Sequence, residues 1–111
     1  MSPTQRSLAH LRERGFEAKV VEKWNPFAGI RQDLWGWMDI IAYHPGERVT
    51  LGVQTTSRPH LAERKNKVSG NPFAATWLAA GNKIEVHAWA RRKPRGGKRV
   101  FYELLREEIV I

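Results

Sequence analysis

One acid and one polar cluster stand out in the middle of the chain, within a stretch that predicts a two-stranded hairpin. Asp39 interrupts the apolar run 37–43, and Gln54, Thr55 and Thr56 end the run that begins at residue 49. A proline and a glycine at 45 and 46 provide the turn between the runs. Because an unpaired buried charge is expensive, Asp39 needs a partner. A cation of the protein, a metal ion or water at the mouth of a cleft could supply it.

The register of this hairpin decides whether these polar groups meet. If the strands pair about residues 46 and 47, position 39 faces position 54. The two-residue period of a strand then places Gln54 and Thr56 on the same face. We therefore expect Asp39, Gln54 and Thr56 to converge at one end of the hairpin.

The segments around the hairpin predict an α/β or α+β layer in which helices flank a mixed sheet. A helix is expected over 2–14, because Ser2, Pro3 and Gln5 form a capping pattern and Gly15 can end it. Further helices are expected over 60–69 and 73–80, and the second of these is apolar nearly all round and should be buried. Strands are expected over 16–24, 37–44, 49–55, 83–91 and 100–105, with a loop over 25–34 and a short strand in 106–111.

Length and composition indicate one folded domain over residues 1–111. The apolar fraction is 41%, with five tryptophans that, apart from Trp35, are expected in the core. There is no cysteine, which excludes disulfides and thiolate metal sites, and no two of the four histidines have a zinc-ligand spacing. No apolar run is long enough to span a membrane, and the N-terminus does not resemble a signal peptide. We expect a cytoplasmic, intracellular protein without a membrane partner.

The charge balance favours a nucleic-acid partner, because the chain carries a formal net charge of +8. Basic side chains gather in the helix over 60–69 and in the loop over 91–99. A solvated basic surface, or a surface that meets an acidic protein, is the alternative. Trp35, beside a glycine in a loop, is a candidate for base stacking. The side chains expected to contact phosphates are Arg31, Arg58, His60, Arg64, Lys67, Arg91, Arg92, Lys93, Arg95, Lys98 and Arg99.

The order of these elements and polar residues resembles the core of the PD-(D/E)XK nuclease superfamily, which includes restriction endonucleases and archaeal-type Holliday junction resolvases. That core is α-β-β-β-α-β, with an Asp at one end of the second core strand and (Glu/Gln)-x-Lys on the third. Asp39 corresponds to the Asp, and Gln54-Thr55-Thr56 corresponds to (Glu/Gln)-x-Lys over a region of roughly residues 4–90. Two positions depart from the commoner pattern, since Gln54 replaces Glu and Thr56 stands where Lys is expected.

The resemblance implies metal-dependent hydrolysis of DNA phosphodiester bonds, with Mg²⁺ (or Mn²⁺) as the cofactor. Asp39, Gln54 and Glu22 are the expected ligands, and Asp33 is an alternative source of the second negative charge. Asp39, Gln54, Thr56 and Lys65 are the expected catalytic set, in which Lys65, or else Lys67, takes the place of the missing lysine. Enzymes of this kind act as dimers to cut two strands, so a homodimer is also implied, although no sequence feature locates an interface.

Two functions follow from the substitutions at 54 and 56. The first is an active endonuclease, and the second is a nuclease-like module that binds DNA without cutting it. A third possibility is a structural module whose charge meets an acidic protein. A cluster of Asp39, Gln54, Glu22 and Lys65 would favour the enzyme. An Asp39 closed in a salt bridge with Arg31 would favour the binding module.

Overall fold

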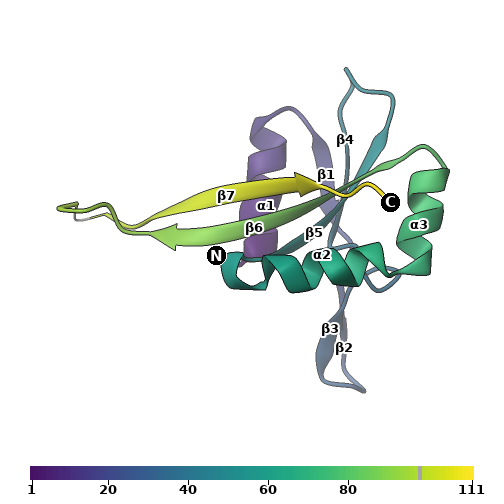
Figure 1. Ribbon diagram of the computed structural model, residues 1–111, viewed down its shortest axis with the longest axis horizontal. Helices are drawn as coiled ribbons and strands as arrows, with labels where there is room; N and C mark the ends of the chain where they lie inside the picture. The colour runs from purple at the N-terminus through teal and green to yellow at the C-terminus, as the bar shows by residue number, and fades with distance from the viewer. Residues whose placement is uncertain (98) are drawn as a thin grey trace.

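A five-stranded mixed sheet organises the chain in the computed structural model, which describes residues 1–97 and 99–111 (Figure 1). The strand order is β1-β4-β5-β6-β7, and the β5–β6 pair is parallel while the other three pairs are antiparallel. β6 and β7 continue beyond the other strands as a long arm (Figure 1). The strands are β1 Glu17–Val20, β4 Ile40–Tyr43, β5 Thr50–Ser57, β6 Lys83–Arg92 and β7 Phe101–Glu108.

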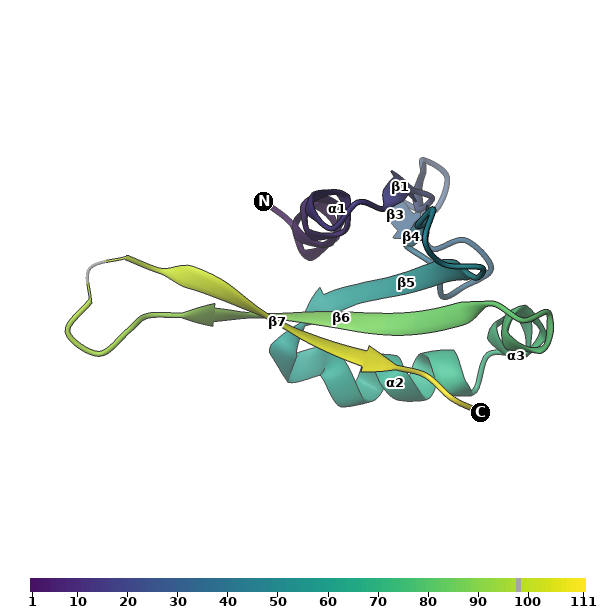
Figure 2. The same ribbon diagram turned by 90° about the horizontal axis from the view of Figure 1, so that it is seen from above.

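Helices cover both faces of this sheet. α1 (Pro3–Glu13) lies on one face and α2 (Leu61–Ser69) on the other, while α3 (Pro72–Ala79) lies at the end of the sheet (Figure 2). A 3₁₀ turn, η1 (Arg58–His60), joins β5 to α2. The expected fold class is confirmed, including the order α1-β1-β4-β5-α2-β6 within the longer chain. Within the described residues, no helix has the length and apolar character that crossing a membrane requires.

Capping side chains begin two of the helices. Ser2 Oγ accepts a hydrogen bond from the Gln5 backbone N–H at 3.2 Å, as the capping pattern predicts. Asn71 Oδ1 accepts from the backbone N–H groups of Phe73 (2.8 Å) and Ala74 (3.2 Å) at the start of α3. These side chains satisfy backbone donors that have no partner inside the helix.

The β4–β5 hairpin has the register that the turn predicts. Ile40 pairs with Val53 and Tyr43 with Thr50, and the Asp39 backbone N–H donates to the Val53 carbonyl at 2.8 Å. β5 is buried from residue 51 to residue 56, on both faces, rather than alternating. This follows from its place in the sheet, because a central strand covered by helices on both sides has no face toward water.

The strand predicted over 16–24 is wrong as a single element. β1 ends at Val20, and residues 23–25 form β2 (Lys23–Asn25), which pairs with β3 (Ile30–Gln32) in a separate two-stranded sheet. This hairpin projects from the body of the molecule (Figure 1). Asn25 Oδ1 accepts from the backbone N–H groups of Phe27 and Ala28, so a side-chain-supported turn closes a hairpin where a loop is predicted.

Other boundaries and burials also differ from the prediction. β4 begins at Ile40 instead of residue 37, because a turn with Trp35 at φ 55° precedes it. α3 is exposed over most of its surface, with only Ala74 buried, because it lies at the end of the sheet rather than beneath it. Trp24 is 58% exposed rather than in the core. The C-terminal tail extends β7 to residue 108 instead of forming a strand of its own.

The core forms two clusters, one on each face of the sheet. Leu8 and Leu11 of α1 pack with residues of β4 and β5 on one side. Trp37 and Met38 pack with Val68 of α2 and residues of β6 on the other. Trp37 is fully buried and lies directly over Gly52, where an added Cβ would approach its ring to 2.3 Å. A glycine is therefore required at 52 by the close approach of an aromatic ring.

Gly52→Ala should lower the free energy of unfolding by about 1–3 kcal/mol, because the methyl group forces Trp37 out of its packed position. Gly46→Ala is the matched control, since its Cβ would meet only the ring of His44 on the surface. The control should change stability by less than about 0.5 kcal/mol. Urea unfolding followed by tryptophan fluorescence measures both values, and equal stabilities for the two variants would contradict the packing described.

Candidate metal centre

A cleft of about 710 Å³ opens where the β2–β3 hairpin, the end of β5 and the start of α1 meet. Its walls combine carboxylates, hydroxyls and cations. Acidic groups come from the segments that flank the hairpin, hydroxyl groups from α1 and β5, and basic groups from β3, η1 and α2. The lining residues are Pro3, Thr4, Glu22, Arg31, Gln32, Asp33, Gly36, Asp39, Gln54, Thr55, Thr56, Ser57, His60, Arg64 and Lys67.

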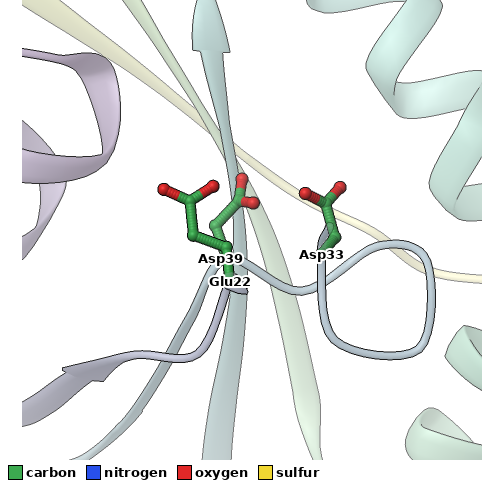
Figure 3. Close-up of side chains that lie close together, drawn as sticks. All are labelled: Glu22, Asp33 and Asp39. Atoms are coloured by element: carbon green, nitrogen blue, oxygen red, sulfur yellow. The ribbon is translucent and has the colours of Figure 1, made fainter. Parts of the chain in front are cut away.

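Three carboxylates lie close together in this cleft (Figure 3). One oxygen from each of Glu22, Asp33 and Asp39 lies within 4.8 Å of the other two. Glu22 immediately precedes β2, Asp33 immediately follows β3 and Asp39 immediately precedes β4. The β2–β3 hairpin therefore begins and ends at two of the three acids, and its closure brings them together.

Asp39 is held rigidly by the end of β5. Its Oδ2 accepts hydrogen bonds from Gln54 Nε2 (2.5 Å), the Thr55 backbone N–H (2.8 Å) and Thr55 Oγ1 (3.1 Å). Thr55 Oγ1 also lies 2.7 Å from Thr4 Oγ1, which ties the site to the first turn of α1. The expected meeting of Asp39 with Gln54 is confirmed by this contact, and Thr56 lines the same cleft.

No cation neutralises Asp39 among the described residues, in contrast to the salt bridge with Arg31 that would favour a binding module. Arg31 Nη1 lies 3.7 Å from Glu22 Oε1 instead. Lys67 Nζ lies 2.7 Å from Asp33 Oδ2. The two outer acids of the cluster thus have cationic partners, while the most buried acid is held by hydrogen-bond donors and has no cationic partner among the described residues.

This arrangement shifts the pKa values of Asp39 and Asp33 in opposite directions. Burial raises the pKa of Asp39 to about 8, and a hydrogen bond with Asp33 and the negative charges of Asp33 and Glu22 act in the same direction. For Asp33, burial acts to raise the pKa. Hydrogen bonds with Asp39 and Lys67, together with the charge of Lys67, outweigh it and lower the pKa. Asp39 is therefore largely protonated at pH 7 while no cation is bound.

The donor set fits a hard divalent cation. Gln54 is 1% exposed, and its Oε1 has no hydrogen-bond partner among the described residues. This amide oxygen and the carboxylates of Glu22, Asp33 and Asp39 are the oxygen ligands that Mg²⁺ and Mn²⁺ take. The Thr55 backbone carbonyl lies 3.4 Å from Gln54 Nε2. A buried acceptor left without a donor costs free energy, and a bound cation would satisfy it.

Lys67, rather than Lys65, reaches the cleft from α2. Lys65 forms an ion pair with Glu107 of β7 and is not among the residues that line the cleft. The prediction for Lys65 is corrected by this placement. Residues two apart on a helix point in different directions, so only one of the two lysines can approach Asp33.

The other expected basic residues divide into two groups. His60 and Arg64 line the cleft with Arg31, and Arg64 Nε is buried without a hydrogen-bond partner among the described residues. The second group of basic residues lies on η1 and on the β6–β7 arm. Arg58, Arg91 and Arg92 line a different cavity, Lys93, Arg95 and Arg99 are exposed, and Lys98 lies outside the described residues.

Trp35 is 47% exposed and lies near the cleft without lining it. Its ring centroid is 6.1 Å from that of Trp77, and its backbone carbonyl accepts from Asn71 Nδ2 at 3.0 Å. Its contacts in the structure are therefore with α3 and its cap. Sequence reasoning missed Thr4, which supports Thr55 from α1, because no spacing in the sequence connects residues 51 positions apart.

Comparisons with known proteins add little to this site. No family model and no curated protein matches the sequence. Among solved structures, the chain is similar to Hjc of Archaeoglobus fulgidus, a Holliday junction resolvase from an archaeal hyperthermophile. The likeness covers 91% of this chain and 73% of that chain, with 18% sequence identity and a TM-score of 0.49. A likeness at this level assigns no activity, substrate or metal to this chain.

Because the pKa of Asp39 is raised, the free energy of unfolding should depend on pH when a chelator keeps metal ions from binding. The folded state keeps a proton on Asp39 that the unfolded chain releases near its ordinary value of 3.8, so the free energy of unfolding falls from about pH 4 to about pH 8. Asp39→Asn preserves an oxygen acceptor for Gln54 and Thr55 and has no proton to lose. Its melting temperature should therefore rise relative to the wild type as the pH increases from 5 to 8.

The control for this comparison is Glu17→Gln, an exposed position on β1. It should show the wild-type dependence of melting temperature on pH. A constant difference between Asp39→Asn and the wild type from pH 5 to pH 8 would contradict the burial of a protonated Asp39.

Proposed function

We propose that this chain is a metal-dependent nuclease domain of PD-(D/E)XK type that hydrolyses DNA phosphodiester bonds. The observation that carries the proposal is the meeting of Glu22, Asp33 and Asp39 within 4.8 Å, in a cleft rimmed by cations. A structural acid would be expected to pair with a protein cation, whereas Asp39 is buried next to two further acids. Ionisation of Asp39 beside these acids is favoured when a further cation joins the cluster.

Glu22, Asp33, Asp39 and Gln54 would hold a divalent cation in this cleft. When bound there, a divalent cation polarises a phosphate oxygen and activates water. The chain's own residues orient the groups around it. Gln54 and Thr55 fix the Asp39 carboxylate through three hydrogen bonds, and the hairpin places Glu22 and Asp33 opposite it.

The basic side chains on the rim of the cleft have different roles in this proposal. Lys67 is placed beside Asp33 on the wall of the cleft, where its ammonium group can contact the scissile phosphate and stabilise developing negative charge. Arg64 offers a buried N–H donor without a partner among the described residues, which suits a phosphate oxygen. Arg31, on β3, adds a third positive charge at the rim. Thr56 contributes a hydroxyl group in place of a charge.

The net charge of +8 supports a polyanionic substrate. Cutting both strands of a duplex needs two such clefts, and a homodimer would supply them.

The second candidate function is a binding module without catalysis. It is favoured by one contact, the 2.5 Å hydrogen bond from Gln54 Nε2 to Asp39, because this pairing holds the acid in place without a metal ion.

Cleavage of DNA should require a divalent cation and Asp39. Wild-type protein with Mg²⁺ or Mn²⁺ should cut plasmid or branched DNA, and Asp39→Asn should reduce cutting to the level seen in a chelator, because it removes a charged ligand. Isothermal titration with Mn²⁺ should show binding to the wild type and to Glu17→Gln, and not to Asp39→Asn. If the wild type binds DNA and leaves every form intact with both metals, the domain is a binding module.

Lys67→Met and Lys65→Met form a matched pair that separates catalysis from general charge. Both remove one positive charge from α2, but only Lys67 lines the cleft. Lys67→Met should lower the cleavage rate by about 10²–10³-fold, as expected for loss of one stabilising group. Lys65→Met should cut at close to the wild-type rate. Equal losses in the two variants would indicate that the lysines act only through overall charge.

A further inference from the structure

A second cavity, of about 640 Å³, adjoins the metal cleft. Its walls combine two aromatic rings with four guanidinium groups, and no acid is among the described residues that line it. The lining comes from the start of α1, η1 and the base of the β6–β7 arm. These residues are Met1, Pro3, Arg6, Ser57, Arg58, Pro59, Trp89, Ala90, Arg91, Arg92 and Tyr102.

The aromatic wall is built before any ligand arrives. The Arg6 guanidinium carbon lies 3.3 Å from the centroid of the Tyr102 ring, which is a stacked cation–π contact between α1 and β7. Trp89 Nε1 donates to Ser7 Oγ at 2.9 Å, and Ser7 Oγ lies 2.9 Å from His87 Nδ1. Ser7 and His87 are fully buried, so Trp89 is anchored to a buried hydrogen-bond network.

The cavity continues from the metal cleft. Pro3 and Ser57 line both spaces, and β5 leads from Thr55 in the cleft to Ser57 at the shared wall. Two residues of strand separate Thr55 from Ser57, which is about 7 Å at about 3.3 Å per residue. A nucleic-acid strand whose phosphate lies at the carboxylates would reach the wall shared with the second cavity within about two nucleotides, at about 3.4 Å each.

We propose that this second cavity binds one unpaired nucleotide of the DNA whose phosphodiester bond lies in the metal cleft. The inference rests on the proposed function and names the substrate feature that the domain selects. The base stacks against the Arg6–Tyr102 pair or Trp89, since guanidinium planes and aromatic rings are the usual platforms for unstacked bases. Arg58 and Arg91 hold its phosphates.

The shape of the site excludes a base that remains paired. A base inside a duplex is stacked on both faces, so it must leave the stack to enter a concave cavity. Leaving the stack costs free energy in a paired duplex and little at a flap, gap or single-stranded end. The domain therefore prefers DNA with unpaired nucleotides a few positions from the bond that it cuts. An acidic peptide would satisfy the arginines and leave the two aromatic rings without a planar partner.

The test compares two labelled DNA duplexes of equal length, one fully paired and one with a short unpaired end. Fluorescence anisotropy in a chelator measures the affinity for each without cleavage. The wild type should bind the unpaired end about tenfold more tightly, the size expected for stacking of one base. Tyr102→Ala should bring this ratio close to one, and Tyr102→Phe, which keeps the ring, should restore it. Tyr43→Ala, on the exposed surface of β4 away from both cavities, should keep the wild-type ratio.

Several outcomes would overturn the proposal. An equal affinity of the wild type for both duplexes would do so, as would a preference that survives Tyr102→Ala in folded protein, checked by circular dichroism. Displacement of the unpaired DNA by polyglutamate as effectively as by an unlabelled oligonucleotide would identify an acidic-peptide site instead. Asp39-dependent cutting of paired DNA without any preference would refute only this inference. A Tyr102-dependent preference in a protein that never cuts would refute only the proposed nuclease activity.

Discussion

The electrostatic repulsion among Glu22, Asp33 and Asp39 is the constraint on which the rest of the structure depends. Three carboxylates within 4.8 Å resist ionising together, and the fold holds them there by covalent and hydrogen-bonded means. The β2–β3 hairpin closes between the first two acids, and the end of β5 supplies three donors to the third. Removing any of these supports would let the acids separate and relax. A fold that maintains such a cluster gives up stability at neutral pH for a site that a cation can complete.

The central strand β5 links this site to the core. Its antiparallel pairing with β4 sets Asp39 level with Gln54, and its parallel pairing with β6 brings α2 across the opposite face. Gly52 allows Trp37 to pack against the strand and so brings the turn before Asp39 close to the sheet. The same strand therefore sets both the packing of the core and the geometry of the cleft. Accordingly, β5 has no exposed residue between 51 and 56.

The central hairpin could be predicted from the sequence because its turn is short and its register follows from it. The pairing of Asp39 with Gln54 needs only the turn at 45 and 46 and the two-residue period of strands. The convergence of Glu22 and Asp33 could not be predicted from the sequence. It depends on a hairpin whose turn is supported by the Asn25 side chain, in a segment that resembles a loop. The choice of Lys67 over Lys65 depends on the rotation of α2. That rotation is set by burial of Val68, the one fully buried residue of a mostly polar helix, and one such residue specifies it weakly.

The positive charge of the chain is distributed unevenly, and this distribution connects the two cavities. On β7 and the start of β6 the acids are paired locally, with Glu107 against Lys65, Glu108 against Lys83 and Glu85 against Arg106. These pairs neutralise the part of the sheet farthest from the arm. Toward the arm Arg92 pairs with Glu103 at 3.7 Å, while arginines from α1, η1 and β6 line a cavity whose described lining residues include no acid. If the proposed function holds, a single strand of DNA would contact the second cavity and the metal cleft in succession.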